Sequence, residues 1–481
     1  MTKSVQTQPI FGKTRHIHMV GIGGIGMSGM AEILLQRGYT ISGSDGSVSE
    51  TTERLTELGA TVHVGHSGSN IEGADVVVYT SAVQADQNVE TRTAMERGIP
   101  VIKRAEMLAE LMRMKYGIGI AGTHGKTTTT TMTGLVVQSG DFDPTIIVGG
   151  RVHSFDKTNA VVGSGDIFIV EADEFDRTFL RLSPSLAVIT NMELEHVDIY
   201  EDDEDIKNAF VEFANKVPFY GAVIICLDDP MLRSIIPRID RRMITYGFTP
   251  QAKVRAVDAK QGAMKSTFTV FFEDQELGKI SVKAPGEHNI RNALASIAIG
   301  LELGMDFESI KKGLQKYTGI FRRFQIKYEE DDLMVIDDYA HHPTEVQATL
   351  QAIKKGWPKR RVVAVFQPHL YSRTQELYED FGLSFFDAEK VVITDIYPSR
   401  EEPIEGVTGQ LVADTAKAYG HRGVHYVNDK NELPSHLNEI VEPGDIVVTM
   451  GAGDIYKYGE LYVQMLRKGD KKVSSPEKKK K

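Results

Sequence analysis

The segment from Gly117 to Thr133, GIGIAGTHGKTTTTTMT, constrains the fold of this chain more than any other stretch. It begins with a short apolar run that predicts a buried strand, continues into a glycine loop, and ends in a threonine-rich stretch that favours a helix start. Backbone N–H groups of such a loop point at phosphate oxygens, and the helix dipole favours negative charge there. We therefore predict a phosphate loop, with Lys126 reaching the outer phosphates and the hydroxyl of Thr127 or Thr128 holding Mg²⁺.

This loop departs from the strict pattern G-x-x-x-x-G-K-[ST], because Ile120 stands at the first glycine position. The glycines that are present are Gly119, Gly122 and Gly125, which makes the loop a shortened form of the pattern. An ordinary Gly-Lys-Thr turn is the alternative. The strand, glycines, lysine and hydroxyls nevertheless come in the order that phosphate binding requires.

A second glycine turn lies near the start of the chain. The segment 16–20 predicts a strand that leads into Gly21–Gly26, which fits G-x-G-x-x-G, and Asp45 follows where a dinucleotide-binding fold holds a ribose. Taken alone, this predicts an NAD(P) dehydrogenase. The turn requires only a diphosphate linked to a ribose, so a UDP-sugar would also fit, and a packing turn without a ligand is the third interpretation.

Acidic residues follow a strand predicted at 166–170, downstream of the phosphate loop. They are Glu171, Asp173, Glu174 and Asp176. One of them is expected to hold Mg²⁺ or to position water, and the others to be solvated. After another predicted strand, His196 lies between carboxylates and is either a metal ligand or structural.

Two further segments of the middle region carry polar patterns. The acidic run 201–205 predicts a solvated helix start. The amides near His288, which precede an alanine-rich helix, either bind the edge of a base or cap that helix.

Polar residues also follow the predicted strands of the last region. Tyr339 and the twin histidines His341 and His342 come after a strand at 333–336, and Pro343 fits the first turn of a helix. His369 and Arg373 follow a strand at 362–366; Arg373 suits a small-molecule carboxylate because its fork is bidentate and always charged. The twin histidines could instead be helix-capping surface residues.

Composition narrows the class of protein. A chain of 481 residues with 41% hydrophobic content is long enough for roughly two to four globular domains. The net charge of −11 argues against a nucleic-acid partner. A single cysteine, Cys226, excludes an internal disulfide and fits a reducing cytoplasm, and no signal-peptide core or membrane-spanning run is present. The basic C-terminal tail is predicted to be disordered.

Strands alternate with helices in three successive regions, which predicts three α/β domains: a Rossmann-like domain at 1–114, a central P-loop ATPase-like domain at 115–321 and a second Rossmann-like domain at 322–481. Only the central domain carries the lysine-containing loop with acids after it. One nucleoside triphosphate and a second ligand with its own diphosphate are therefore expected. Residue chemistry alone does not choose between a kinase, a ligase and an ATPase.

The sequence resembles the Mur ligase family in many blocks spread over all three regions. The matching blocks are GIGGIGMSGMAE, SGSD, RAEMLAELMR, GTHGKTTTT, EADEFD, TNMELEHVDIY, GEHNIRNALA, GIFRRF, DDYAHHPTE and FQPHLYSRT. The segment 210–212 lacks the lysine that related ligases carbamylate, which fits the alanine-adding branch.

The resemblance implies ATP- and Mg²⁺-dependent amide formation in peptidoglycan synthesis, by a cytoplasmic monomer or homodimer. Phosphorylation of the carboxylate of UDP-N-acetylmuramate would precede attack by the amine of L-alanine.

The resemblance also implies roles for particular residues, with Lys126, His196 and Arg373 as the catalytic set. Those implied to bind ATP are Gly122, Thr123, His124, Gly125, Lys126, Thr127, Thr128, His288, Asn289, Asn292, Arg323 and Asp338. Those implied to hold metal are Thr127, Glu171 and His196. Those implied on the UDP-sugar side are Gly23, Gly24, Ser44, Asp45, Ser81 and His124. Those implied around the amino acid are Tyr339, His341, His369 and Arg373.

Overall fold

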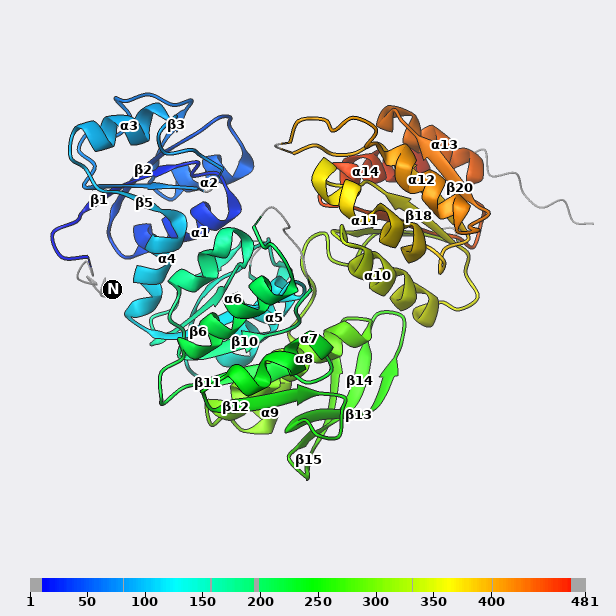
Figure 1. The fold of residues 1–481 in the computed structure, drawn as a ribbon, viewed down its shortest axis with the longest axis horizontal. Helices are drawn as coiled ribbons and strands as arrows, with labels where there is room; N and C mark the ends of the chain where they lie inside the picture. The colour runs from blue at the N-terminus through cyan, green and yellow to red at the C-terminus, as the bar shows by residue number, and fades with distance from the viewer. Residues whose placement is uncertain are drawn as a thin grey trace, which may run out of the picture. The chain divides into compact units, whose positions relative to one another are not determined.

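The computed structural model describes residues 11–80, 82–155, 158–193, 199–330, 332–399 and 401–468. The chain forms two compact units. The first comprises Met1–Asp258, Phe268–Val282 and Ile290–Thr318, and the second comprises Ala259–Thr267, Lys283–Asn289 and Gly319–Lys481. Three sheets of five, ten and six strands carry the fold, each with helices packed on it (Figure 1). The predicted fold class of three α/β domains is confirmed.

The first sheet is parallel throughout and has the strand order β3-β2-β1-β4-β5. Its strands are β1 His16–Val20, β2 Thr40–Asp45, β3 Thr61–Val64, β4 Val76–Tyr79 and β5 Val101–Lys103. Its helices are α1 Ile25–Gln36, α2 Glu50–Glu57, α3 Val89–Glu96 and α4 Arg104–Arg113. Strand order reverses between β1 and β4, and open α/β sheets bind ligands beyond the carboxyl ends of such a strand pair.

The middle sheet places the phosphate-loop strand between two strands, one of which ends in a carboxylate while the other is directly followed by polar residues. Its order is β15-β14-β13-β12-β11-β10-β6-β9-β7-β8, so β6 lies between β10 and β9 and is parallel to both. The strands are β6 Tyr116–Ala121, β7 Thr145–Ile147, β8 Ala160–Val161, β9 Ile167–Glu171, β10 Leu186–Ile189, β11 Ala222–Cys226, β12 Met243–Gly247, β13 Val254–Gln261, β14 Ser266–Phe272 and β15 Gln275–Val282. The helices are α5 Lys126–Gln138, α6 Asp203–Asn215, α7 Pro230–Ile235, α8 Glu287–Glu302 and α9 Phe307–Gln315.

The last sheet has the order β16-β17-β21-β18-β19-β20, with only β16 antiparallel to its neighbour among the pairs described. Its strands are β16 Gln325–Glu330, β17 Leu333–Asp338, β18 Val362–Phe366, β19 Lys390–Thr394, β20 Val424–Val427 and β21 Ile446–Met450. Its helices are α10 Pro343–Gly356, α11 Tyr371–Ser384, α12 Gly409–Ala418, α13 Leu433–Ile440 and α14 Ile455–Arg467.

The central strands β17, β18 and β21 of this last sheet are buried on both faces, because each face is covered by helices. Alternate residues of β18 illustrate this: Ala364 and Phe366 join the core under α10, α11 and α12, while Val363 and Val365 join the core under α13 and α14. Fully apolar strands of this kind are typical of parallel sheets with helices on both sides.

Several local predictions are confirmed. Pro343 is in the first turn of α10, and the acidic run 201–205 forms the exposed start of α6, where Asp202 caps the helix by accepting from the N–H groups of Glu204 and Asp205. The strands β13, β14 and β15 were not predicted. Among the described residues, no helix is long and apolar enough to cross a membrane.

Candidate functional site: a phosphate loop clamped by two strand ends

The phosphate loop connects β6 to α5 and packs closely against the end of β10. Gly122 and Gly125 have φ values of +131° and +80°, in the region that favours glycine. A Cβ on Gly122 would lie 2.1 Å from the Thr190 hydroxyl oxygen and 3.0 Å from the Asn191 carbonyl oxygen. Only glycine fits at this point, so the local sequence fixes the loop against its neighbouring strand.

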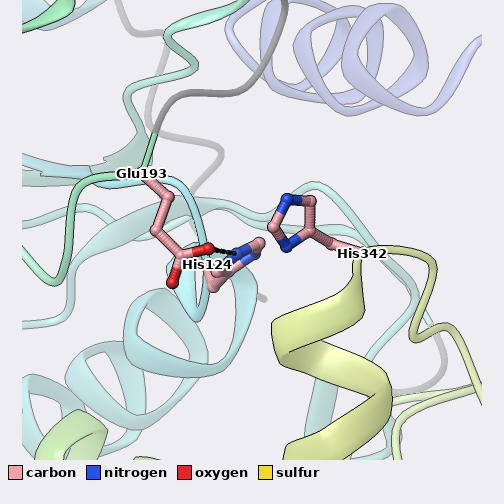
Figure 2. A group of neighbouring side chains, drawn as sticks. All are labelled: His124, Glu193 and His342. Carbon is pink, nitrogen blue, oxygen red and sulfur yellow. Dashed lines mark hydrogen bonds and ion pairs between the residues drawn. The ribbon is translucent and has the colours of Figure 1, made fainter. Parts of the chain in front are cut away.

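Side chains that follow β10 hold the backbone of the loop in place. The His124 N–H donates to Asn191 Oδ1 over 2.7 Å, and the Thr190 hydroxyl donates to the His124 carbonyl over 2.7 Å. The Glu193 N–H donates to the Thr123 hydroxyl over 2.9 Å. Figure 2 shows the His124 ring facing the Glu193 carboxylate, with 3.3 Å between Nε2 and Oε2. The conformation of the loop is therefore built into the protein, as electrostatic preorganisation requires.

Lys126 points back into the loop and meets a buried carboxylate. Its Nζ donates to the carbonyl oxygens of Gly122 and Thr123 over 2.8 and 3.2 Å. It also lies 2.8 and 2.7 Å from the two carboxylate oxygens of Glu174, whose side chain is 1% exposed. The interpretation of the remaining strand-end acids as solvated is thus wrong for Glu174, because it forms a buried ion pair with the loop lysine.

Thr127 and Glu171 form a pair of oxygen donors beside the lysine. The Thr127 hydroxyl donates to Glu171 Oε2 over 3.2 Å, and the Gly149 N–H donates to Glu171 Oε1 over 2.6 Å. Burial raises the pKa of Glu171. A hydroxyl and a carboxylate are the ligand types that Mg²⁺ prefers next to a phosphate loop, so the residues fit this ion. The third residue implied to hold metal, His196, lies outside the described residues.

Two of the residues expected near the base, Asn292 and Asn289, have different surroundings. Asn292, buried in α8, accepts from the Thr129 hydroxyl over 3.1 Å, and its Oδ1 would be 2.7 Å from a Cβ on Gly125. Asn292 therefore packs on the phosphate loop itself. Asn289 donates to the Pro285 carbonyl over 2.6 Å and lies 3.0 Å from the ring of His288, so it makes local contacts at the start of α8.

The glycine turn of the first sheet is held by the acid that follows it in sequence. The Gly23 N–H donates to Asp45 Oδ2 over 2.9 Å, and a Cβ on Gly23 would lie 2.8 Å from the same oxygen. Gly24 is the N-cap of α1. Ser44 is fully buried, and its hydroxyl contacts Glu90 and His66. Ser81 lies outside the described residues.

The second unit gathers aromatic and basic side chains after β17 and β18. The rings of Tyr339 and His341 lie 5.2 Å apart, and those of His341 and His369 lie 6.1 Å apart. Arg373, in the first turn of α11, is 9% exposed. The structure thus brings together three of the four residues expected around the amino acid.

The capping interpretation of the twin histidines is wrong. His342 is buried at the N-cap of α10, where its side chain makes no capping hydrogen bond. His341 Nδ1 lies 2.9 Å from the Tyr339 carbonyl oxygen and 3.2 Å from the Glu345 carboxylate.

Asp338 is the last residue of β17, and Arg323, which lies just before β16, is its neighbour. Asp338 accepts from the N–H groups of Phe324 and Ala340 over 3.0 and 2.9 Å. Burial raises the pKa of Asp338 to about 6, although the Arg323 charge opposes this shift. Arg323 also pairs with Glu345 over 3.2 Å.

Sequence reasoning missed several residues that shape these sites, namely Glu174 as the partner of Lys126, Glu90 beneath Ser44, and Thr190, Asn191 and Glu193 as the loop clamp. The clamp had a detectable signal, since polar residues directly follow an apolar strand next to the phosphate loop. The pairing of Glu174 with Lys126 depends on how the loop after β9 turns, which residue spacing does not give.

A phosphate loop at the centre of one sheet, a glycine turn at the strand-order reversal of another and a third α/β domain define a multidomain phosphate-loop protein. The family models agree: the Mur ligase family catalytic domain matches residues 16–116, the Mur ligase middle domain matches residues 120–300, and the Mur ligase glutamate ligase domain matches residues 322–453. The chain belongs to the Mur ligase family.

Relatives of known name match over almost the full length. UDP-N-acetylmuramate–L-alanine ligase from Salinibacter ruber is 55% identical over 96% of this chain and 97% of its own. The enzyme of the same name from Geotalea daltonii is 54% identical over 95% of this chain and 99% of its own.

Solved structures match over a similar length. The UDP-N-acetylmuramate-alanine ligase of Thermotoga maritima is 28% identical, covers 94% of this chain and 99% of its own, and superposes with a TM-score of 0.79. A murein peptide ligase from Psychrobacter arcticus, 23% identical, covers 94% of this chain and 98% of its own with a TM-score of 0.69, and so shares the fold.

Proposed function

We propose that this chain joins L-alanine to the carboxylate of UDP-N-acetylmuramate at the expense of ATP, in the synthesis of peptidoglycan precursors. The observation that carries the proposal is the identity of 55% and 54%, over nearly the whole chain, with relatives named UDP-N-acetylmuramate–L-alanine ligase. The three family domains argue against the dehydrogenase interpretation of the glycine turn, which rested on that turn alone.

The proposed reaction has two steps. A carboxylate oxygen of the muramate attacks the γ-phosphorus of ATP, the bond from the γ-phosphorus to the β-bridging oxygen breaks, and ADP leaves. The amine of alanine then attacks the acyl carbon, an amide forms, and phosphate leaves with the former carboxylate oxygen. The amine loses a proton in this step. Phosphoryl transfer depends mainly on positioning and on neutralising charge, which matches a preorganised loop with a lysine.

Residues of the loop supply these effects. Lys126 offers a cation inside the loop, and the clamp from Thr190, Asn191 and Glu193 keeps the loop backbone in one shape. Thr127 and Glu171 would hold Mg²⁺, which supplies charge neutralisation at the phosphates. The position of Asn292 against the loop supports a contact on the nucleotide side.

The other two domains would hold the two partners to be joined. The glycine turn after β1, with Gly23, Gly24 and Asp45, would take the diphosphate and ribose of the UDP-sugar. Arg373 would take the carboxylate of alanine, with Tyr339, His341 and His369 around it. We place the domain boundaries at 114 and 321, in keeping with this division of ligands among three domains. We also propose a cytoplasmic location, which would fit the use of ATP and the single cysteine, Cys226.

Phosphate release measured with ATP, Mg²⁺, UDP-N-acetylmuramate and each amino acid in turn tests the proposal. Release that needs both the sugar nucleotide and an amino acid, and that is fastest with L-alanine, is expected. Release that is independent of the sugar nucleotide, or fastest with a different amino acid, would contradict the proposal.

A further inference from the structure

The ion pair between Lys126 and Glu174 places a negative charge where a phosphate loop should bind an anion. Both carboxylate oxygens of Glu174 lie within 2.8 Å of Lys126 Nζ, and the side chain is 1% exposed. A buried carboxylate at this distance shields the lysine strongly, since water does not screen the pair. Any phosphate oxygen that approaches Lys126 must compete with Glu174 for the same N–H donors.

The protein holds Glu174 firmly in this position. The residue precedes the 3-10 helix Phe175–Arg181, and its carbonyl accepts from the buried Tyr200 hydroxyl over 2.8 Å. Arg177 stacks on the Tyr200 ring with 4.9 Å between the guanidinium carbon and the ring centroid, and it pairs with Asp205 of α6. The Glu174 backbone is therefore tied to α6 through Tyr200 and Arg177.

Glu171 and Glu174 have separate partners, although Glu171 ends β9 and Glu174 lies three residues further on. Glu171 accepts hydrogen bonds from the Thr127 hydroxyl and the Gly149 N–H, whereas Glu174 forms an ion pair with Lys126. Glu174 is therefore not a duplicate of Glu171, because its carboxylate faces the ammonium of the loop lysine.

We propose that Glu174 is a positioning residue that holds the Lys126 ammonium inside the loop and competes with the nucleotide phosphates for it. This competition weakens the retention of ADP and so speeds product release. The inference rests on the proposed function only in taking the nucleotide to be ATP.

The central test measures Mg²⁺–ADP affinity by equilibrium dialysis for the full-length protein and for Glu174→Gln. Since a charge-assisted hydrogen bond to the lysine is lost, ADP should bind about tenfold more tightly. Under steady-state conditions kcat and the KM for ATP should fall together, because ADP leaves more slowly. Unchanged or weaker ADP binding would overturn the proposal.

Asp173→Asn is the matched control, because it removes the same charge from the same loop and leaves both Glu174 oxygens on Lys126. ADP affinity should change less than twofold in this variant. An equal tightening would show a general charge effect and overturn the role of Glu174.

A double-mutant cycle separates action through the lysine from direct repulsion of phosphate. In a Lys126→Met background, Glu174→Gln should leave ADP affinity unchanged, because the contested ammonium is gone. A tenfold effect that persists in this background would refute the proposal. If Glu174→Gln does not fold, Glu174→Asp is the second variant, because its carboxylate lies one methylene further from Lys126. It should tighten ADP binding two- to threefold, and an unchanged ADP affinity would contradict the proposal.

The outcome for Glu174 and the outcome for the proposed function are distinguishable. A chain that ligates alanine but shows no Glu174 effect on ADP contradicts only this inference. A chain that shows the Glu174 effect without any alanine-dependent phosphate release contradicts only the proposed function.

Discussion

Glu90 stabilises the first sheet because its carboxylate is buried yet fully ionised. The side chain is 0% exposed, and it accepts from the Asn70 amide over 2.6 Å and from the Ser44 hydroxyl, with His66 Nδ1 3.1 Å away. Burial alone would raise the pKa of Glu90, but the nearby His18 ring, with Nε2 3.7 Å away, and hydrogen bonds from Ser44, Asn70 and His66 outweigh it and lower the pKa from 4.5 to about 2.

The size of this contribution follows from the two pKa values. A shift from 4.5 to about 2 corresponds to roughly 3 kcal/mol of stability at pH 7. Because the folded-state pKa is depressed, the contribution is complete above pH 4.5 and is lost as the pH falls toward 2. At pH 3 roughly 1.5 kcal/mol should remain.

Glu90→Gln should therefore destabilise the first domain by roughly 3 kcal/mol at pH 7, with a difference from wild type that shrinks below pH 4.5. Urea unfolding followed by far-UV circular dichroism reports on every domain. The fluorescence of Trp357, the single tryptophan, reports on the second unit, where it stacks on Phe324. The first circular-dichroism transition should move to lower urea while the Trp357 transition stays in place.

Glu72→Gln is the matched control in the same domain. Its carboxylate is 82% exposed and pairs with Arg97 over 3.4 Å, so its loss should cost less than about 1 kcal/mol. A Glu90→Gln effect no larger than that of Glu72→Gln, or one that does not change between pH 7 and pH 3, would refute the reasoning.

Three other substitutions test the site. Lys126→Met should abolish phosphate release while UDP-N-acetylmuramate still binds in equilibrium dialysis; near-normal turnover would remove Lys126 from the reaction. Arg373→Ala should raise the KM for alanine about tenfold or more with a smaller change in kcat, in steady-state assays, and an unchanged KM would exclude Arg373 from that pocket. Gly122→Ala places a Cβ 2.1 Å from the Thr190 hydroxyl oxygen and should weaken ADP binding at least tenfold without unfolding the protein, as judged by circular dichroism; wild-type affinity would show that the clamp is not rigid.

Most of the fold could be predicted because its strands are short apolar runs bounded by turn residues. The segments 16–20, 166–170, 333–336 and 362–366 are predicted as strands and overlap β1, β9, β17 and β18. The strands β13 to β15 were not predicted from the sequence. β14 nevertheless alternates buried and partly exposed residues, which is the period-two pattern of a strand. β13 and β15 are more polar than the central strands β6, β9 and β10, and each has exposed residues, which those central strands lack.

Those residues of the candidate site that lie at or just after the ends of strands could be predicted from the sequence. Glu171 is one of four acids expected at the end of this strand, and the family resemblance implies that it holds metal; in the structure it ends β9 and accepts from the Thr127 hydroxyl. The pairing of Lys126 with Glu174 could not be predicted, because four acids within six residues compete for one role and only the turn after β9 selects among them. Glu90 was missed for a similar reason: it lies on α3, far in sequence from Ser44, and only tertiary packing joins them.

Isotope tracing tests the central claim that ATP activates the muramate carboxylate before alanine attacks it. UDP-N-acetylmuramate labelled with ¹⁸O in that carboxylate would be incubated with the protein, ATP, Mg²⁺ and L-alanine, and the released phosphate would be analysed by mass spectrometry. The account predicts one ¹⁸O atom in each phosphate, since the oxygen that attacks the γ-phosphorus leaves with it. Phosphate that carries no ¹⁸O while the amide forms would contradict the account.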